Sequence, residues 1–400
     1  MKAVILAAGE GSRMRPLTYT RPKVMLPVAG RPILEHLLIE TLSAGVTEFV
    51  FVVGYRDDQV RRYFGHGERW GAAINYCVQR SQSGTADALR QTRELVQGNF
   101  LLMNGDVLAR AADIKALAAS AADTMAVTEV ADAGSLGSVE VVGERVVRIH
   151  EKVANPPSQL ANAGLYLLTP AIFKAIDRTV KSPRGEYELT DSLQLMIDGG
   201  IEVACYRLGY WLDLSYPWDI LSANEVLLQK LEPACVGTLE PGVTVKGKIA
   251  IGRDTTIRSG SYLVGPIIIG NGCDIGPNCY IRPATTIGDH CRIGGGVEVK
   301  NSVVMADTKI PHQSYVGDSV IGEGCNLGAG TRLANLRLDG KGVYAAGIDT
   351  GRRKLGAILG DNVEIGVNAC LNPGTMVGNG ARIGPGAVAG GTIAPGCHIC

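Results

Sequence analysis

From Val245 to Met305, every sixth residue is aliphatic. A period of six fits neither an α-helix nor a strand that alternates between two faces. It is typical of a β-helix, in which each six-residue unit supplies one short strand and one turn, and three units complete a coil. Coils then stack about 4.8 Å apart, the ordinary distance between strands. The sequence therefore predicts one inward column of aliphatic side chains in the second half of the chain.

A small or apolar residue stands two positions before each aliphatic one, and we expect it to face inward as well. Five of the ten cysteines occupy this position: Cys273, Cys279, Cys291, Cys325 and Cys397. The close pair Cys397 and Cys400 lacks a partner set for zinc. We therefore interpret the cysteines as core residues, and unpaired buried thiols favour a reducing cytoplasm.

The repeat is expected to stop at Pro311–His312 and to return in new frames, first at Ile321 and later at Ile365. Two breaks result, one at 311–318 with the sequence PHQSYVGD and one at 335–355. Long excursions from a regular scaffold are usually functional loops. We expect these breaks to carry chemistry.

The 400 residues, 46% of them hydrophobic, suffice for two domains, which we place at 1–230 and 231–400. A formal net charge of zero gives no reason to expect nucleic acid or an anionic membrane as a partner. The first residues have too short an apolar run for a signal peptide, and no apolar stretch of about 18 residues follows. We therefore expect a cytoplasmic protein that acts on small molecules.

Residues 1–230 read as alternating strands and helices, which predicts an α/β fold with a mostly parallel sheet covered on both faces. The expected strands are 2–7, 48–53, 73–78 and 100–103. The expected helices are 32–43, 57–64, 85–96 and 112–119. Ligands of such sheets bind beyond the carboxyl ends of the strands.

The chemistry begins after the first strand, in LAAGEGSRMRPLTYTRPK at 6–23. Gly9 and Gly11 allow backbone N–H groups to converge on an anion, and Arg13 and Lys23 supply positive charge. Met14 replaces the third glycine of a dinucleotide fingerprint, and no P-loop sequence follows. The alternative is a basic surface loop. Taken as a whole, segment 6–23 resembles the corresponding segment of the sugar-1-phosphate nucleotidylyltransferases.

That resemblance implies a Rossmann-like domain in which a sugar phosphate attacks the α-phosphorus of UTP or dTTP and releases pyrophosphate, with Mg²⁺ as the cofactor. It implies nucleotide binding by Gly9, Gly11, Arg13, Lys23, Gln79, Gly84 and Thr85, with Arg13 and Lys23 catalytic. It implies sugar-phosphate binding by Gly137, Glu151, Lys152 and Asn162. Asp106 and Asp213 are the implied metal ligands, and carboxylate oxygens suit Mg²⁺.

Each of these motifs has a local alternative that the sequence leaves open. The Asn-Gly-Asp run ending at Asp106 is also a hairpin-turn sequence. Asp213 could cap the helix that begins near Tyr216. Glu151 and Lys152 could be an exposed pair on a strand. RPLTYTRPK is closer to the thymidylyltransferases, so UTP and dTTP are not distinguished.

The second half carries Arg282, VEVK ending at Lys300, PHQSYVGD, CNLGAGT and LANL in that order. This order resembles the acetyltransferase half of the bifunctional glucosamine-1-phosphate acetyltransferase/uridylyltransferases. The resemblance implies a left-handed parallel β-helix, a homotrimer and acetyl-CoA as a substrate. His312 is the natural general base, because imidazole titrates near neutral pH. The implied acceptor and coenzyme site comprises Arg282, Lys300, Tyr315, Asn326, Asn335 and Lys354.

Three hypotheses follow. The first is a two-site enzyme of UDP-N-acetylglucosamine synthesis. The second is a single-activity nucleotidylyltransferase whose β-helix serves oligomerisation or regulation, and the third is a non-catalytic binding subunit. The long segment after Asn335, and Val367 where the bacterial enzymes tend to have serine, leave the coenzyme contacts open, and the choice between gluco- and galacto-amino sugar stays open.

Overall fold

The computed structural model describes residues 1–131, 133–134 and 136–400. Its contacts divide the chain into two compact units. The first contains Met1–Glu10, Arg21–Met25 and Ile33–Asp213. The second contains Gly11–Thr20, Leu26–Pro32 and Leu214–Cys400.

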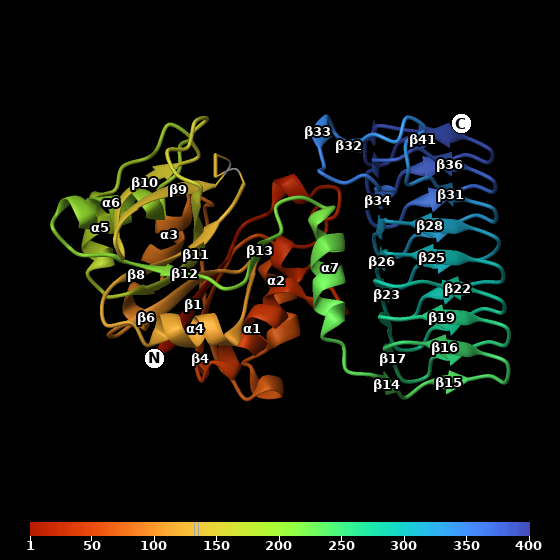
Figure 1. Ribbon diagram of the computed structural model, residues 1–400, viewed down its shortest axis with the longest axis horizontal. Helices are drawn as coiled ribbons and strands as arrows, with labels where there is room; N and C mark the ends of the chain where they lie inside the picture. The colour runs from red at the N-terminus through yellow and green to blue at the C-terminus, as the bar shows by residue number, and fades with distance from the viewer. Residues whose placement is uncertain (132, 135) are drawn as a thin grey trace. The chain divides into compact units, whose positions relative to one another are not determined.

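The first unit is built on a nine-stranded sheet of order β5-β4-β1-β6-β11-β8-β12-β10-β9 (Figure 1). Its strands are β1 (Lys2–Ala7), β4 (Glu48–Val53), β5 (Ala73–Val78), β6 (Phe100–Asn104), β8 (Thr124–Glu129), β9 (Gly137–Val142), β10 (Arg145–Glu151), β11 (Leu160–Leu168) and β12 (Ala204–Arg207). Its helices are α1 (Ile33–Ser43), α2 (Asp57–Phe64), α3 (Thr85–Arg90), α4 (Ala111–Ala118), α5 (Ile172–Arg178) and α6 (Leu189–Asp198). The four expected strands are present within one residue.

Successive residues of β1 alternate between two cores. Ala3 and Ile5 join the cluster with Leu37 of α1, Val60 of α2 and Ile114 of α4. Val4 joins the other cluster, which holds residues of α3, α5 and α6. Helices therefore cover both faces of the sheet, as the sequence predicted.

The expectation of a mostly parallel sheet is wrong for half of it. The pairs β5–β4, β4–β1 and β1–β6 are parallel, but β11 is antiparallel to β6, β8 and β9. The pair β12–β8 is again parallel, so this half of the sheet is mixed. The sequence reading also missed a hairpin there. β9 and β10 are antiparallel neighbours joined through Gly143, whose φ of 63° suits a tight turn.

One expected helix is shorter than predicted. The helix at 85–96 ends at Arg90, and a 3-10 turn follows at Arg93–Leu95. The Thr92 hydroxyl donates a hydrogen bond of 2.8 Å to the Leu89 carbonyl oxygen. Such side-chain bonds to the backbone compete with helix propagation.

The second unit is a parallel β-helix of three sheets, visible in Figure 1 as stacked columns of short strands. Sheet I contains β14 (Ala234–Cys235), β17 (Ile249–Ile251), β20 (Ile267–Ile269), β23 (Thr285–Ile287), β26 (Val303–Val304), β29 (Val320–Ile321), β34 (Ala357–Leu359), β37 (Thr375–Val377) and β40 (Thr392–Ile393). Sheet II contains β15 (Thr238–Leu239), β18 (Thr256–Ile257), β21 (Asp274–Ile275), β24 (Arg292–Ile293), β27 (Lys309–Ile310), β30 (Asn326–Leu327), β35 (Glu364–Ile365), β38 (Arg382–Ile383) and β41 (His398–Ile399). Sheet III contains β16 (Thr244–Lys246), β19 (Tyr262–Val264), β22 (Tyr280–Ile281), β25 (Glu298–Lys300), β28 (Tyr315–Gly317), β31 (Arg332–Leu333), β36 (Cys370–Leu371) and β39 (Val388–Ala389).

The predicted aliphatic column is confirmed, but its register changes earlier than the sequence suggested. Ile287 pairs with Val304 rather than Met305, and Ile310 and Val316 continue the column. One residue is missing between Val299 and Val304, another between Val316 and Ile321, and two between Ala389 and Ile393. All three deletions fall at the corner from sheet III to sheet I. The turn at Pro311–His312 is therefore regular, and the repeat does not stop there.

Helix α7 (Asp219–Gln229) packs on the β-helix through Asn224, a fully buried residue of the second unit. Its amide nitrogen donates to the Ala284 carbonyl oxygen at 2.8 Å. Its amide oxygen accepts from the Thr286 hydroxyl at 2.7 Å and from the Ala29 backbone N–H at 3.0 Å. This satisfied amide fixes the rotation of α7 on sheet I.

The predicted break at 335–355 is present as an arm, defined here as residues 335–355. The Leu355 N–H donates to the Asn335 carbonyl oxygen at 3.0 Å, which closes the base of the arm. Its tip is the hairpin of β32 (Tyr344–Ala345) and β33 (Ile348–Asp349). None of the described helices is long and apolar enough to cross a membrane.

Four of the five cysteines predicted to face inward are buried: Cys273, Cys279, Cys291 and Cys325. Cys397 is exposed, so its predicted burial is wrong. It lies in the last turn, where no further coil covers it. All ten cysteines are free thiols.

Burial gives a labelling prediction. It raises the pKa of Cys279 to about 11 and the pKa values of Cys291 and Cys325 to about 12, so their thiolate is scarce at pH 8. Under native conditions at pH 8, iodoacetamide should label the exposed Cys235 and spare these three. Mass spectrometry of tryptic peptides measures this, with labelling in denaturant as the control. Native labelling of Cys325 as fast as Cys235 would contradict the burial.

Candidate functional sites

In the first unit, the structure brings the two predicted metal ligands together around Lys23. Asp106 lies in the turn before β7 (Val107–Ala109), which pairs with β13 (Trp211–Asp213) so that Asp213 is opposite Val107. The Lys23 Nζ lies 2.6 Å from Asp106 Oδ2 and 3.9 Å from Asp213 Oδ1. The lysine side chain is 9% exposed and Asp106 is 31% exposed. Two carboxylates thus face one cationic atom at an accessible edge.

This pair of carboxylates suits a hard divalent cation. The described residues contain no group of three or more His, Cys, Asp or Glu that could enclose a metal. Mg²⁺ usually takes one or two carboxylates and fills its other positions with water and substrate phosphates. The donor set of Asp106 and Asp213 fits that mode of binding.

The glycines after β1 have different roles. A Cβ at Gly9 would meet no atom within 4 Å, so its backbone is open to a ligand. Gly11 has φ 73° and precedes the 3-10 turn Ser12–Met14, and its carbonyl oxygen accepts from the Thr18 hydroxyl at 2.9 Å. Arg13 is exposed, 5.7 Å from the ring centroid of Tyr216 in the same unit. Arg13 and Lys23 belong to different units, so their joint action on one nucleotide stays a prediction.

Gln79, Gly84 and Thr85 lie together between β5 and α3. The Gln79 amide nitrogen donates to the Gly84 carbonyl oxygen at 3.0 Å and to Asp87 Oδ2 at 2.9 Å. Because Asp87 only accepts, the amide orientation is fixed, and the Gln79 oxygen is left to accept from a ligand. The Thr85 hydroxyl accepts from the Leu189 N–H at 3.0 Å and can still donate its own proton.

The predicted sugar-binding residues form a second group in the same unit. A Cβ at Gly137 would lie 3.3 Å from Asn162 Cβ and 3.4 Å from Glu151 Oε2, so glycine allows all three to meet. Glu151 Oε2 accepts from the Thr190 hydroxyl at 2.9 Å. Lys152 Nζ lies 3.7 Å from Glu151 Oε1. The four predicted residues are therefore neighbours.

Asn162 is held in one orientation. Its Oδ1 accepts from the Tyr166 hydroxyl at 2.8 Å and from the Gly164 N–H at 3.0 Å, which leaves its amide nitrogen as a donor. Burial raises the pKa of Tyr166, which keeps this hydroxyl a donor. A Cβ at Gly164 would lie 2.4 Å from Asn104 Nδ2, so glycine lets the strand before Asp106 approach the sugar group.

In the second unit, Lys300, Tyr315 and Asn335 meet at the shortened corner between sheets III and I. The residue that joins them is Asp318, which the sequence reading did not select. Its carboxylate accepts from Lys300 Nζ at 3.0 Å and from Asn335 Nδ2 at 2.5 Å. Asn335 Nδ2 also donates to the Tyr315 hydroxyl at 3.1 Å. Only its place in YVGD, next to Tyr315, could have pointed to Asp318.

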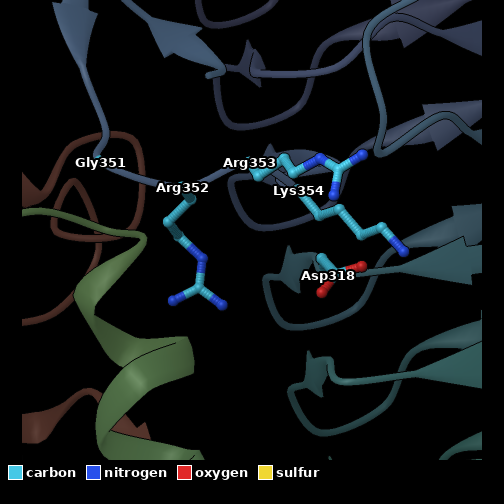
Figure 2. A pocket seen from close by; sticks show the side chains of 5 residues that line it. All are labelled: Asp318, Gly351, Arg352, Arg353 and Lys354. Atoms are coloured by element: carbon cyan, nitrogen blue, oxygen red, sulfur yellow. The ribbon is translucent and has the colours of Figure 1, made fainter. Parts of the chain in front are cut away.

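Lys354 borders the same group. A cavity of about 360 Å³ is lined by Asp318, Gly351, Arg352, Arg353 and Lys354. Figure 2 shows the Lys354 side chain extending over Asp318, whereas Arg352 points toward α7. Arg353 is exposed and was also missed from the sequence. The cavity therefore offers two cationic side chains, Arg353 and Lys354, beside Asp318.

Of the other predicted acetyl-site residues, Arg282 lies at this corner, whereas His312 and Asn326 lie away from it. Ile281 pairs with Val299, so Arg282 lies one coil before Lys300. Arg282 donates to Glu298 Oε1 at 2.8 Å, and this bond raises its pKa. His312 is exposed in the turn from sheet II to sheet III, and none of the described residues forms a hydrogen bond with its ring. Asn326 is exposed on β30 of sheet II. The predicted base and the Asp318 corner thus lie at opposite ends of β28.

Residues 2–230 match the family model described as nucleotidyl transferase, and residues 263–377 match the one described as GMPPB C-terminal domain. The solved structure of UDP-glucose pyrophosphorylase complexed with UDP-glucose matches with a TM-score of 0.53 at 23% identity, over 57% of this chain and 99% of that one. At that identity the likeness shows the fold alone. The fold and these matches define a nucleotidyltransferase domain followed by a β-helix.

Full-length relatives are more specific. The bifunctional protein GlmU of Methanococcus maripaludis (strain C7) is 42% identical over 392 residues, covering 96% of this chain and 93% of its own. That of Methanocaldococcus jannaschii is 40% identical, with 96% and 93% covered. The bifunctional sugar-1-phosphate nucleotidylyltransferase/acetyltransferase of Sulfurisphaera tokodaii is 39% identical, with 97% of each chain covered. The chain belongs to this GlmU family.

A glycine at the corner gives a structural prediction. A Cβ at Gly317 would lie 2.5 Å from the Tyr315 hydroxyl and 2.6 Å from Asn335 Nδ2, so Gly317→Ala should separate these two side chains. We expect a loss of about 1–3 kcal/mol in unfolding free energy, the usual scale of overpacking. Denaturant unfolding measures it. The control is Gly295→Ala, whose Cβ would come no closer than 3.5 Å to its neighbours; equal losses in both would contradict the steric cause.

Proposed function

We propose that the protein is a two-site enzyme that makes a nucleoside-diphosphate N-acetylamino sugar. The observation that carries this proposal is the presence of a separate phosphate-suited site in each unit. Lys23 stands between Asp106 and Asp213 in the first, and Lys300, Tyr315 and Asn335 meet in the second. The relatives named bifunctional GlmU support both activities in one chain.

The first reaction site transfers a nucleotide. An oxygen of the sugar phosphate attacks the α-phosphorus of the triphosphate, and the bond to the leaving pyrophosphate breaks. No general base is needed, because the sugar phosphate is already an anion. Asp106 and Asp213 would hold Mg²⁺, which supplies charge stabilisation to the transferring phosphate. Lys23 and Arg13 bind phosphate oxygens and offset their negative charge.

The sugar and the base are recognised by oriented amides. The Asn162 nitrogen donates to a sugar hydroxyl or amide oxygen, and Glu151 accepts from hydroxyl groups. The Gln79 oxygen accepts a hydrogen bond, which matches the N3–H of a pyrimidine such as uracil. Thymine carries the same N3–H, so this contact serves UTP and dTTP equally.

The second reaction site transfers an acetyl group. The amine nitrogen of an amino-sugar phosphate attacks the thioester carbonyl of acetyl-CoA, the carbon–sulfur bond breaks, and the thiolate leaves. His312 takes the proton that the amine loses. Lys300 and Arg282 bind the sugar's phosphate. Arg353 and Lys354 border a cavity whose charge suits a phosphate of the coenzyme or the sugar.

We propose that the protein assembles as a homotrimer. Asp318 is six positions after His312, a span of at most about 20 Å, and the two lie at opposite corners of sheet III. A head-to-tail ring of three copies would place the His312 corner of one β-helix near the Asp318 corner of the next. The arm supports this proposal, because it exposes apolar side chains: Leu336, Leu338, Tyr344 and Ile348. We place the reactions in the cytoplasm, in keeping with the free thiols.

Two substitutions should separate the activities. With glucosamine-1-phosphate, acetyl-CoA, UTP and Mg²⁺, His312→Ala should abolish release of free thiol by removing the base. It should spare pyrophosphate release from N-acetylglucosamine-1-phosphate. Asp106→Ala should do the reverse. Thiol and pyrophosphate are followed in parallel assays, with His398→Ala, another exposed histidine of the β-helix, as the matched control.

Two outcomes would decide against the acetyl transfer. Thiol release by His312→Ala within a few-fold of the unchanged protein would remove His312 from its role. Release of pyrophosphate but no thiol by the unchanged protein would favour a single-activity nucleotidylyltransferase.

The trimer has its own test. Leu338 is fully exposed in one chain, and Leu338→Asp should place an unpaired charge in the contact between copies. The molar mass by light scattering should fall from that of three chains toward that of one. Val236→Asp, at another exposed aliphatic residue of the second unit, is the control and should leave the mass unchanged. A full trimer with Leu338→Asp would exclude the arm from the interface.

A further inference from the structure

The Asp318 carboxylate is the most completely bonded group at the corner between sheets III and I. Its side chain is 5% exposed. Oδ1 accepts from Asn301 Nδ2 at 2.8 Å, and Oδ2 accepts from Lys300 Nζ and Asn335 Nδ2. Asp318 has φ 49°, a left-handed conformation that is rare for residues other than glycine, and its N–H donates to the Lys300 carbonyl oxygen at 2.9 Å. The same conformation recurs at other turns of the β-helix, for example at Asp307 and Gln313, so Asp318 occupies a regular turn position.

A carboxylate only accepts hydrogen bonds, so it fixes the direction of its neighbours. The amide nitrogen of Asn335, and not the oxygen, must face Asp318. The same nitrogen donates to the Tyr315 hydroxyl oxygen, so the Tyr315 proton must point elsewhere. Among the described residues, none donates to the Asn335 amide oxygen and none accepts the Tyr315 proton.

We propose that Asp318 is a positioning residue that sets the hydrogen-bond polarity of the acetyl-acceptor site. Through Asn335 it presents one acceptor, the Asn335 amide oxygen, and through Tyr315 it presents one donor, the hydroxyl proton. The acceptor binds an N–H of the substrate's amine and turns its lone pair toward the thioester. The donor and Lys300 bind an oxygen of the substrate's phosphate. This inference rests on the proposed acetyl transfer.

Helix α7 supports Asp318 through a chain of hydrogen bonds that begins at Asn301. Asn301 Nδ2, which donates to Asp318 Oδ1, also donates to Glu225 Oε1 at 2.8 Å. Glu225 accepts in turn from Arg352 Nη2 at 3.0 Å, and Arg352 Nη1 donates to the Ser222 hydroxyl at 2.7 Å. All these residues belong to the second unit. Helix α7 therefore restrains the carboxylate through Asn301.

The primary test is Asp318→Asn in the full-length protein. An amide at position 318 can donate as well as accept, so Asn335 is no longer held in one orientation. The rate constant kcat of thiol release should fall about tenfold or more, the scale of one lost charge-assisted hydrogen bond. The KM for acetyl-CoA and pyrophosphate release from N-acetylglucosamine-1-phosphate should stay unchanged.

A reciprocal exchange separates polarity from simple structural support. In the double variant Asp318→Asn with Asn335→Asp, the two side chains bond again but in the opposite direction. The melting temperature should recover toward that of the unchanged protein, whereas thiol release should not. Recovery of thiol release to within about threefold of the unchanged protein would show that Asp318 only supports the fold, and would overturn the inference.

If Asp318→Asn folds poorly, Tyr315→Phe provides a second test of the inference. It removes the donor from a half-exposed ring, so the melting temperature should change little while kcat of thiol release falls about tenfold. A fall of less than about threefold would overturn the donor role. Absence of thiol release from the unchanged protein would instead defeat the proposed function, so the two failures are distinct.

Discussion

The inward aliphatic column of the second unit is the constraint on which its chemistry depends. Each strand is only two or three residues long, so a single strand has little stability of its own, and the stacked coils supply it. Because the column must remain continuous, a missing residue has to be absorbed at a corner. All three deletions fall at the corner from sheet III to sheet I, and the arm also leaves from there. The column therefore decides where the backbone can be irregular, and the irregular corner is where Lys300, Asp318 and Asn335 meet.

The sequence predicted this architecture because its signal is periodic and local. It predicted the column and the arm, but it misplaced the break. Val304 and Met305 are both apolar, so Met305 also satisfied the count of six. Only the pairing of Ile287 with Val304 decides between these positions. The antiparallel half of the first sheet was missed for a different reason. Its hairpin at β9 and β10 has no strong turn dipeptide beyond Gly143.

The site residues also divide into those that the sequence could identify and those that it could not. Asp106 and Asp213 could be selected from motifs, and the structure brings both to Lys23. Asp318 could not be selected, because its importance comes from partners that are remote in the sequence. Asn301 is 17 residues away from Asp318. The hydrogen bonds continue to Glu225, 76 residues from Asn301, and then to Arg352, 127 residues from Glu225. No local pattern records such contacts. Likewise, the Thr85 hydroxyl accepts from the Leu189 N–H at the start of α6, a contact that the motif did not indicate, and its predicted nucleotide binding stays a prediction.

The two sites use the same pair of groups to different ends. In each, a lysine ammonium lies within 3.0 Å of a carboxylate oxygen: Lys23 with Asp106, and Lys300 with Asp318. The proposed metal role requires an accessible carboxylate, and Asp106 meets this requirement because it is 31% exposed. Asp318 is 5% exposed and bonded on both oxygens, so it is held in place on Lys300. Lys300 has further N–H donors while Asp318 orients it. The exposure of the carboxylate is thus the physical difference between the two lysine–carboxylate pairs.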